Sequence, residues 1–163
     1  MSEHPRGKTR PWLRVLVAAA MAVTMTMAIP VAWADSDSAT VRAIKTRQAS
    51  YYLMAQQMAR INATLKGDLP FDKASLELSA DLLLLLSKSA PQSFPVGSDQ
   101  GITKAKSEIW KELPKFNQLA QDAQNEAGKL KTAVSSGDTA LIKAAHGATS
   151  RSCKACHDAY KIK

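Results

Sequence analysis

The residues with the most specific chemistry in this chain are two cysteines and a histidine near its end, in the run Cys153-Lys154-Ala155-Cys156-His157. Two thiols three positions apart lie on one helical turn, where they can form thioethers to both vinyl groups of one porphyrin. C-x-x-C-H is accordingly the attachment signal for covalent haem, and the adjacent imidazole would be an axial ligand of the iron. The alternative is a thioredoxin-like redox pair, but the βαβ pattern typical of such pairs is not visible here.

The N-terminal segment has the three parts of a secretory signal peptide. A basic stretch precedes an apolar run at residues 15–29, and residues 32–34 form the small-x-small cleavage site Ala-Trp-Ala. The apolar run is shorter than the roughly 20 residues that a transmembrane helix needs. We therefore expect residues 1–34 to be removed and residues 35–163 to reach the periplasm with no membrane span.

The charge of the chain narrows the choice of partners. Four of the 22 basic and one of the 14 acidic residues lie in the expected signal peptide, so the mature protein has a net charge of +5. No basic block is interleaved with aromatic residues, so nucleic-acid binding is not expected. A mildly positive surface would instead steer an acidic redox partner. No Ser-His-Asp set, phosphate loop or paired-carboxylate site is apparent, so we do not expect an enzyme.

Residues 35–163 are the size of one domain and show a helical pattern. Core-type residues recur at steps of three and four across residues 41–65, and Gly67 follows where this helix would end. A second helix is expected at residues 72–88, with Asp72 as its N-cap. Its leucine run at residues 82–86 predicts burial on several sides.

The second half of the chain predicts two more helices. Residues 90–101 are rich in Pro, Gly and Ser and predict a loop. A third helix is expected at residues 104–134, starting late or kinked at Pro114. After a break and a helix cap at Ser136-Gly137-Asp138, a fourth helix at residues 139–160 carries the C-x-x-C-H motif. Four helices with mostly short connections predict an all-α fold, an antiparallel four-helix bundle with covalent haem near the C-terminus.

This organisation resembles the cytochrome c′ family, the class II c-type cytochromes. The likeness covers the mature chain and is sharpest at residues 152–160, Ser-Cys-Lys-Ala-Cys-His-Asp-Ala-Tyr. Other family-like segments are Arg47-Gln48, Lys66-Gly67, Pro70-Phe71-Asp72, the Phe94–Gly101 loop, Glu108-Ile109-Trp110 and Ala144-Ala145. Small class I cytochromes carry C-x-x-C-H near the start instead. The resemblance implies one covalently attached haem c.

The resemblance also implies roles for individual residues. Cys153 and Cys156 would carry the thioethers, and His157 would form the proximal bond to the iron. Arg47 and Gln48 would lie near the haem propionates, where a guanidinium pairs well with a carboxylate. The alternative for Arg47 is a solvated charge on a helix face.

The residue facing the sixth coordination position of the iron decides the function. The family places this position on the first helix, and counting back from Lys66-Gly67 gives Tyr51. A neutral Tyr, with a pKa near 10, is a poor ligand, so Tyr51 would cap an open iron face or pack in the core. Met54 and Met58 share roughly this helix face and would be the alternative ligands if the register shifted by a turn.

Two functions therefore remain open. A five-coordinate iron capped by Tyr51 would bind the small gases NO and CO and would also transfer single electrons. A six-coordinate iron with a Met ligand would make the protein an electron carrier for periplasmic redox partners. Peroxidase-like chemistry would need a distal acid–base group, and His146 lies roughly 16 Å from His157 along one helix. We therefore interpret His146 as a packed or surface residue.

The resemblance further implies a possible homodimer, because the family often pairs through its first two helices. Tyr52, Leu53 and the leucine run at residues 82–86 would supply the apolar patch for such a contact. The alternative is that these side chains are internal.

Overall fold

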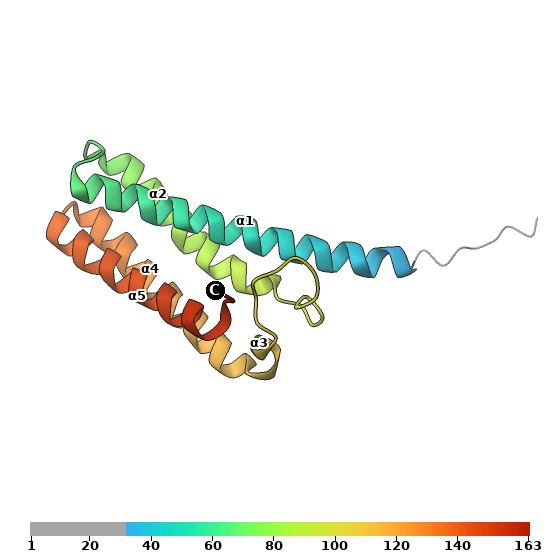
Figure 1. Cartoon of the computed structure of the whole chain (residues 1–163). Helices are drawn as coiled ribbons and strands as arrows, with labels where there is room; N and C mark the ends of the chain where they lie inside the picture. The colour runs from blue at the N-terminus through green and yellow to red at the C-terminus, as the bar shows by residue number, and fades with distance from the viewer. Residues whose placement is uncertain (1–31) are drawn as a thin grey trace, which may run out of the picture. The chain divides into compact units, whose positions relative to one another are not determined.

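The computed structural model describes residues 32–163, with side chains from Ala39 onward. The elements in chain order are α1 (Ala32–Lys66), α2 (Lys73–Ser89), the 3-10 helix η2 (Ala90–Ser93), α3 (Glu108–Lys111), α4 (Leu113–Ser136) and α5 (Thr139–Tyr160) (Figure 1). Within this described part the helices are joined by loops, and the one β-type pairing is an isolated bridge between Ala105 and Lys161. The expected signal peptide lies outside the described residues except for its last three positions, which open α1.

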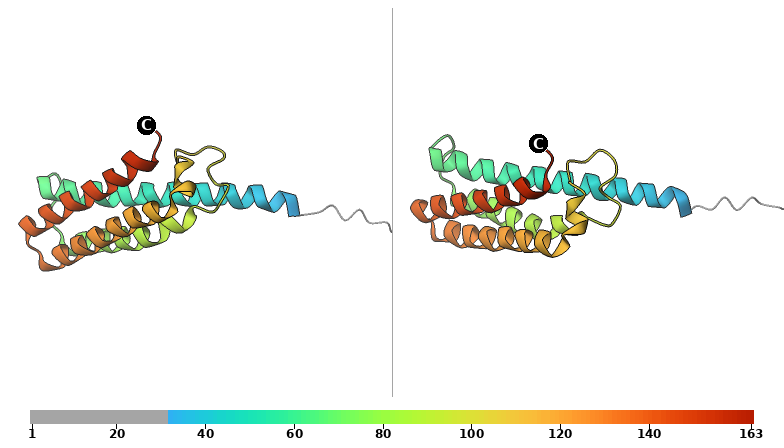
Figure 2. Two further views of the ribbon diagram at one scale, coloured as in Figure 1. Left: turned by 90° about the horizontal axis from the view of Figure 1, so that it is seen from below. Right: turned by 60° about the horizontal axis from the view of Figure 1, so that its bottom comes forward.

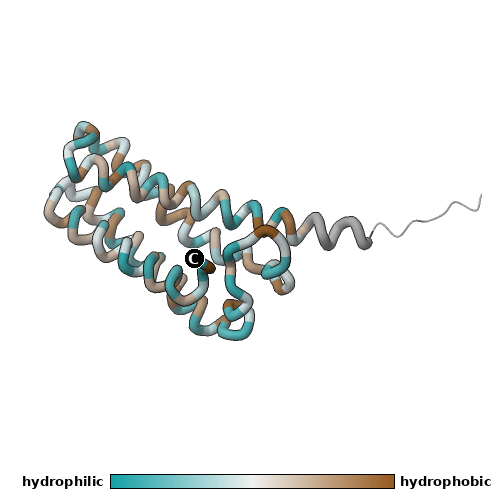
Figure 3. Tube along the Cα trace, in the orientation of Figure 1, coloured by the Kyte–Doolittle hydropathy of each residue, from teal (hydrophilic) through white to brown (hydrophobic). Residues whose placement is uncertain are grey.

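The four long helices form the expected antiparallel bundle. The backbone of α4 approaches both α5 and α2 closely, and Figure 2 shows these helices side by side. Each helix mixes hydrophobic and hydrophilic residues along its length (Figure 3), as expected for helices that bury one face. The main core between them consists of Met54, Ile61, Leu76, Ala80, Leu83, Ala90, Ala127, Leu130, Ala133, Val134 and Ile142.

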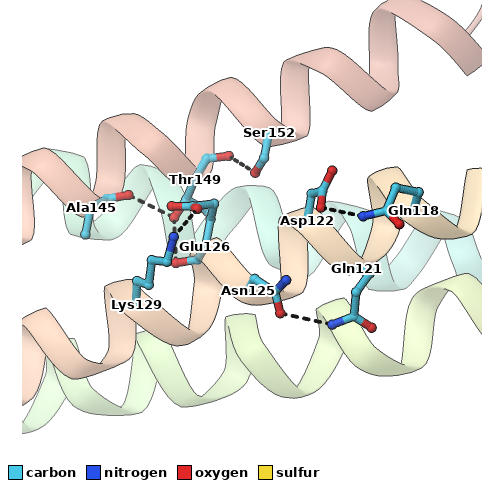
Figure 4. Close-up of polar contacts among 9 residues, drawn as sticks. All are labelled: Gln118, Gln121, Asp122, Asn125, Glu126, Lys129, Ala145, Thr149 and Ser152. Atoms are coloured by element: carbon cyan, nitrogen blue, oxygen red, sulfur yellow. Dashed lines mark hydrogen bonds and ion pairs between the residues drawn. The ribbon is translucent and has the colours of Figure 1, made fainter. Parts of the chain in front are cut away.

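Polar side chains also connect α4 with α5. The hydroxyl of Thr149, 1% exposed, donates to the Glu126 carbonyl at 3.2 Å and to the Ala145 carbonyl at 2.9 Å (Figure 4). The first of these bonds crosses between the two helices, and the second lies within α5. A buried hydroxyl without hydrogen-bond partners would destabilise the folded state. The Thr149 side chain therefore packs between α4 and α5 and also joins the two helices by a hydrogen bond.

The ends of the helices follow the predicted capping residues. Asp72 accepts a hydrogen bond from the backbone N–H of Ala74 at 3.2 Å, and Asp138 accepts one from Ala140 at 2.8 Å. These bonds satisfy backbone donors that have no partner within the helix. Before α5, Gly137 ends α4 in the left-handed conformation, with φ of +74°. The sharp turn into the haem-bearing helix is therefore set by local sequence.

Gly137 and Gly128 offer a matched test of this turn. Neither added Cβ would meet an atom within 4 Å, so only the backbone conformation differs. Gly137→Ala is expected to lower the free energy of unfolding by about 1 kcal/mol, because L-residues are strained at positive φ. Gly128→Ala, inside α4, is expected to raise it by roughly 0.5–1 kcal/mol. Urea unfolding followed by circular dichroism measures both, and changes of the same sign would contradict this account.

The third helix begins later than predicted, and it is interrupted next to Pro114, where a late start or a kink was expected. It was expected from residue 104, but α3 begins only at Glu108, and the chain breaks at Glu112 before α4. Pro114 at the second position of α4 lacks the N–H that a continuous helix would need. Residues 104–106 pair instead with the end of α5. At its other end the chain also differs, since α1 begins at Ala32 rather than near residue 41.

The prediction for the leucine run of α2 was also wrong. Leu83 is 1% exposed, but Leu82 is 37% and Leu85 is 63% exposed. Five consecutive apolar residues must cover every side of a helix, while α2 packs on the bundle with one face only. None of the described helices combines the length with the apolar composition that crossing a membrane requires.

Candidate haem site

The two cysteines lie on the last turns of α5, and both thiols are free and half-buried. Burial raises the pKa of both thiols, and the neighbouring Cys153 helps to raise that of Cys156 to about 11. Both are therefore neutral at physiological pH. The next residue, His157, is partly exposed, and its pKa is lowered by partial burial and by the positive charge of Lys161. The neutral imidazole, the form that ligates metals, is thus favoured.

Tyr51 on α1 faces the two cysteines across the bundle. Burial raises the pKa of its phenol, and the nearby Cys156 and Cys153 raise it further, while Arg47 opposes the shift. Such electrostatic influence requires short distances between the groups. No described residue forms a hydrogen bond with the Tyr51 hydroxyl, which therefore stays protonated and available as a donor.

Aromatic rings surround this position. The ring centroid of Phe94 is 6.4 Å from that of Tyr51, edge to face, and 4.9 Å from that of Phe116. Phe116 in turn lies 5.7 Å from Tyr160. We call Ile109, Phe116 and Tyr160, with the side chains packed on them, the aromatic cluster; Cys156 is one of those packed side chains. The thiols therefore adjoin an apolar, ring-lined environment.

Arg47 is the main polar residue of the site, and it is 3% exposed. Its guanidinium donates to the Ser98 hydroxyl at 2.8 Å, to the Ser98 carbonyl at 2.5 Å and to the Thr103 hydroxyl at 2.7 Å. It also lies over the ring of Phe94, 4.7 Å from the centroid, and near that of Trp110 at 5.9 Å. The alternative of a solvated surface charge is therefore wrong. Arg47 holds the loop after η2, and its contact with propionates remains a prediction.

The remaining predicted residues separate into two groups. Gln48 is exposed and donates to the carbonyl of Ile102 at 2.9 Å, so it joins Arg47 in holding the loop. Met54 is 8% exposed within the main core, and Met58 packs against it. His146 lies 3.1 Å from the Met58 carbonyl through Nε2, in line with its interpretation as a packed residue. The burial of Met54 and the packing of Met58 against the core favour a structural role for both side chains over ligation of the iron.

The sequence carries no signal for the partners of Arg47. Ser98 and Thr103 lie 51 and 56 positions away, and although Ser98 belongs to the family-like Phe94–Gly101 loop, nothing in that segment marks it as a partner of Arg47. The partly buried contact between Tyr160 and Glu112 was missed for the same reason. The Tyr160 hydroxyl donates to Oε2 of Glu112 at 2.9 Å, which ties the end of α5 to the break before α4.

Replacing Tyr160 with Phe tests that tie through pH. Hydrogen bonds from Tyr160 and then Lys115 lower the pKa of Glu112, so the contact contributes stability above the unfolded pKa of about 4.3. That contribution is lost as the pH falls through the lowered folded pKa. Burial and the bond to Glu112 raise the pKa of Tyr160 to about 12. The stability that Tyr160 contributes is therefore complete below pH ~10, the ordinary pKa of a phenol. It is lost as the pH rises through the pKa of Tyr160 in the folded protein.

We therefore expect Tyr160→Phe to have a lower thermal midpoint than the unmodified protein at pH 7. The difference should shrink as the solution is acidified below pH ~4. Tyr52→Phe is the matched control, because Tyr52 is 64% exposed and should show no such difference. A Tyr160→Phe deficit that persists unchanged at pH 2–3, as a rough acid limit, would show that packing rather than the hydrogen bond is responsible.

The arrangement fits a covalently bound haem. Two free thiols lie beside an apolar aromatic cluster, with a neutral imidazole next to them and an unbonded phenol opposite. A helical bundle with the two thiols and the imidazole on its last helix defines a c-type haem protein.

Comparison with known proteins identifies the family. The family model described as Cytochrome C' matches residues 42–161, and the chain belongs to the cytochrome c′ family. Cytochrome c' of Alcaligenes xylosoxydans xylosoxydans is 37% identical over 121 residues, which cover 74% of this chain and 94% of the relative. Cytochrome c' of Rubrivivax gelatinosus is 37% identical over 122 residues, covering 74% and 95%.

Solved structures agree with this assignment. Cytochrome c prime from Shewanella frigidimarina superposes with a TM-score of 0.72 at 39% identity, covering 76% of this chain and 97% of that one. A nitric oxide complex of a mutant cytochrome c prime from Alcaligenes xylosoxidans has a TM-score of 0.71 at 36% identity, covering 76% and 97%. The predicted family, bundle fold and cofactor are thereby confirmed. The protein binds one covalently attached haem c.

Proposed function

We propose that this protein is a periplasmic haem protein with five-coordinate iron, which binds NO and CO at the face covered by Tyr51 and also transfers single electrons. Cys153 and Cys156 hold the haem through thioethers, and His157 provides the axial imidazole. The haem supplies the iron that takes up small gases and changes between its ferric and ferrous states. The observation that carries the proposal is the position of Tyr51 opposite both cysteines.

Tyr51 suits a cap better than a ligand. Burial holds its pKa well above the ordinary value, and the neutral phenol binds iron poorly beside an imidazole. Its ring, packed edge to face on Phe94, restricts access to small molecules. The free hydroxyl can donate a hydrogen bond to a bound diatomic. The nitric oxide complex of the related Alcaligenes protein supports gas binding for this chain as well.

Electron transfer is the second part of the proposal. The apolar, ring-lined environment beside the cysteines would limit the reorganisation that accompanies a change in the charge of the iron. The alternative is a six-coordinate carrier with Met54 or Met58 as the sixth ligand. Burial of Met54 in the main core supports the five-coordinate form.

Optical and EPR spectra of the ferric and ferrous holoprotein, with and without CO, test the proposal. A high-spin ferric signal and ready CO binding are expected. A low-spin spectrum with a Met–iron charge-transfer band and no CO binding would overturn the gas-binding function in favour of the six-coordinate carrier.

Export and pairing complete the proposed function. We expect the exported protein to begin at Asp35, which N-terminal sequencing of periplasmic material would verify.

Tyr52 and Leu53 on α1 are 64% and 45% exposed, and Leu85 on α2 is 63% exposed. These side chains leave an apolar area through which two copies can pair. Sedimentation equilibrium should detect a homodimer that Leu53→Glu weakens, and a monomer at all concentrations would contradict the pairing.

A further inference from the structure

We propose that the surface formed by residues 104–106 and 160–163 is the docking site for an acidic electron-transfer protein. The proposal rests on the electron-transfer part of the proposed function. The two segments run antiparallel, with Ala105 bridged to Lys161. The backbone N–H of Lys106 donates to the Tyr160 carbonyl at 3.0 Å, and that of Ile162 donates to the Lys104 carbonyl at 2.8 Å. We call this pair of segments the lysine ribbon.

The lysine ribbon concentrates positive charge. It holds Lys104, Lys106, Lys161 and Lys163, and no Asp or Glu occurs in its two segments. None of the ion pairs between described residues involves these four side chains. The ammonium of Lys106 donates instead to the Ala159 carbonyl at 2.9 Å, at the end of α5.

Two carboxylates beside the ribbon pair with lysines outside it. Asp158 pairs with Lys154, and Glu112 pairs with Lys115 at 3.3 Å and accepts the Tyr160 hydrogen bond. Within the ribbon, Lys104, Lys161 and Lys163 are exposed, so their positive charge is presented to solvent. A surface of one sign attracts partners of the other and raises their rate of encounter.

Apolar side chains accompany this charge. Ile102, just before the ribbon, is 92% exposed, and Ile162 within it is 49% exposed. Large exposed isoleucines beside charged residues resemble the apolar centre and polar rim of transient protein interfaces. Charge steers such a partner and fixes its orientation, while the isoleucines provide area to be buried.

The ribbon also adjoins the haem-bearing residues. Ala105 packs on the aromatic cluster, as Cys156 does. The backbone N–H of Lys161 donates to the carbonyl of His157 at 3.0 Å. Figure 1 shows the C-terminal segment beside the loop that leads to α3. An acidic protein bound here would therefore contact the end of the bundle that carries the attachment motif.

The test measures reduction of the ferric holoprotein by the hydroquinone of a flavodoxin, an acidic flavoprotein, in a stopped-flow instrument. One electron passes from the flavin hydroquinone to ferric haem, which leaves the flavin semiquinone and ferrous haem. Lys104→Glu/Lys163→Glu is expected to lower the second-order rate constant at low ionic strength at least tenfold. The steep fall of the rate with added salt should also flatten.

Lys66→Glu/Lys143→Glu is the matched control. Both lysines are exposed, at the end of α1 and the start of α5, and the change in net charge is the same. This control should keep the rate within about threefold. Equal losses in both variants, or no loss in either, would overturn the docking proposal.

Dithionite reduction separates this proposal from the proposed function. If dithionite reduces the unmodified holoprotein but flavodoxin hydroquinone does not, the docking proposal alone fails. If neither reduces it, the electron-transfer function fails and the docking proposal fails with it. Unchanged CO spectra in all variants would show that the haem site itself is intact.

Discussion

Replacing Tyr51 with Ala is expected to raise the second-order rate constant for CO binding to the ferrous holoprotein about a hundredfold. The Tyr51 ring contacts Phe94 and packs against the main core. If Tyr51 caps the iron face as proposed, its ring would have to leave this position before a ligand could bind there. Moving a buried aromatic side chain costs about 2–3 kcal/mol, and that barrier corresponds to roughly a hundredfold in rate. Flash photolysis of the CO complex measures the rate directly.

Two further variants separate steric blocking from hydrogen bonding. Tyr51→Phe keeps the ring, so its association rate should stay near that of the unmodified protein, while loss of the hydroxyl should speed ligand dissociation. Tyr52→Ala is the matched control, because its side chain is 64% exposed on the same helix. If Tyr51→Ala and Tyr52→Ala bind CO at the same rate, Tyr51 does not cap the iron face.

Replacing Arg47 with Ala is expected to lower the free energy of unfolding by about 3 kcal/mol. The change removes a buried cation and leaves its acceptors on Ser98 and Thr103 without their donor. Each buried acceptor without a partner costs about 1–3 kcal/mol, and water entering the space would recover part of this. The ring of Phe94 would also lose its contact with the guanidinium.

Urea unfolding of the holoprotein, followed by circular dichroism, measures this loss. Arg47→Lys keeps the charge but lacks the fork of donors that reaches Ser98 and Thr103 together, so it should recover little of the stability. Lys45→Ala, an exposed change two residues earlier on α1, should stay within about 0.5 kcal/mol. A full recovery by Arg47→Lys would show that charge, rather than hydrogen-bond geometry, accounts for the effect.

The two sites of these predictions were accessible from sequence to different degrees. Tyr51 was predicted to face the iron because the family places one helix position there, and the count from Lys66-Gly67 reaches it directly. Arg47 was found by the same resemblance, but its predicted partner was a propionate. Its observed partners lie in a loop more than 50 residues away, and no local pattern links a helix residue to loop oxygens at that separation.

The elements of the fold divide in a similar way. Helix ends with a local cause were predicted, as at Asp72 and Asp138, where the capping side chain bonds to backbone within three residues. The face that α2 buries was not predicted. Its leucine run is apolar on every side, and only packing against α4 selects one face. The late start of α3 likewise depends on residues 104–106, which bond to the end of α5 instead of continuing a helix.

By itself, the sequence determined the attachment chemistry, the helical bundle and the family, because thiol spacing, periodicity and capping act over a few neighbouring residues. Only the tertiary structure decided that Tyr51 faces the cysteines, that Arg47 holds the loop and that two lysine-bearing segments meet beside the end of α5. Each of these depends on contacts between residues distant in the chain. Such contacts are selected by how the helices pack together, which no short stretch of sequence encodes.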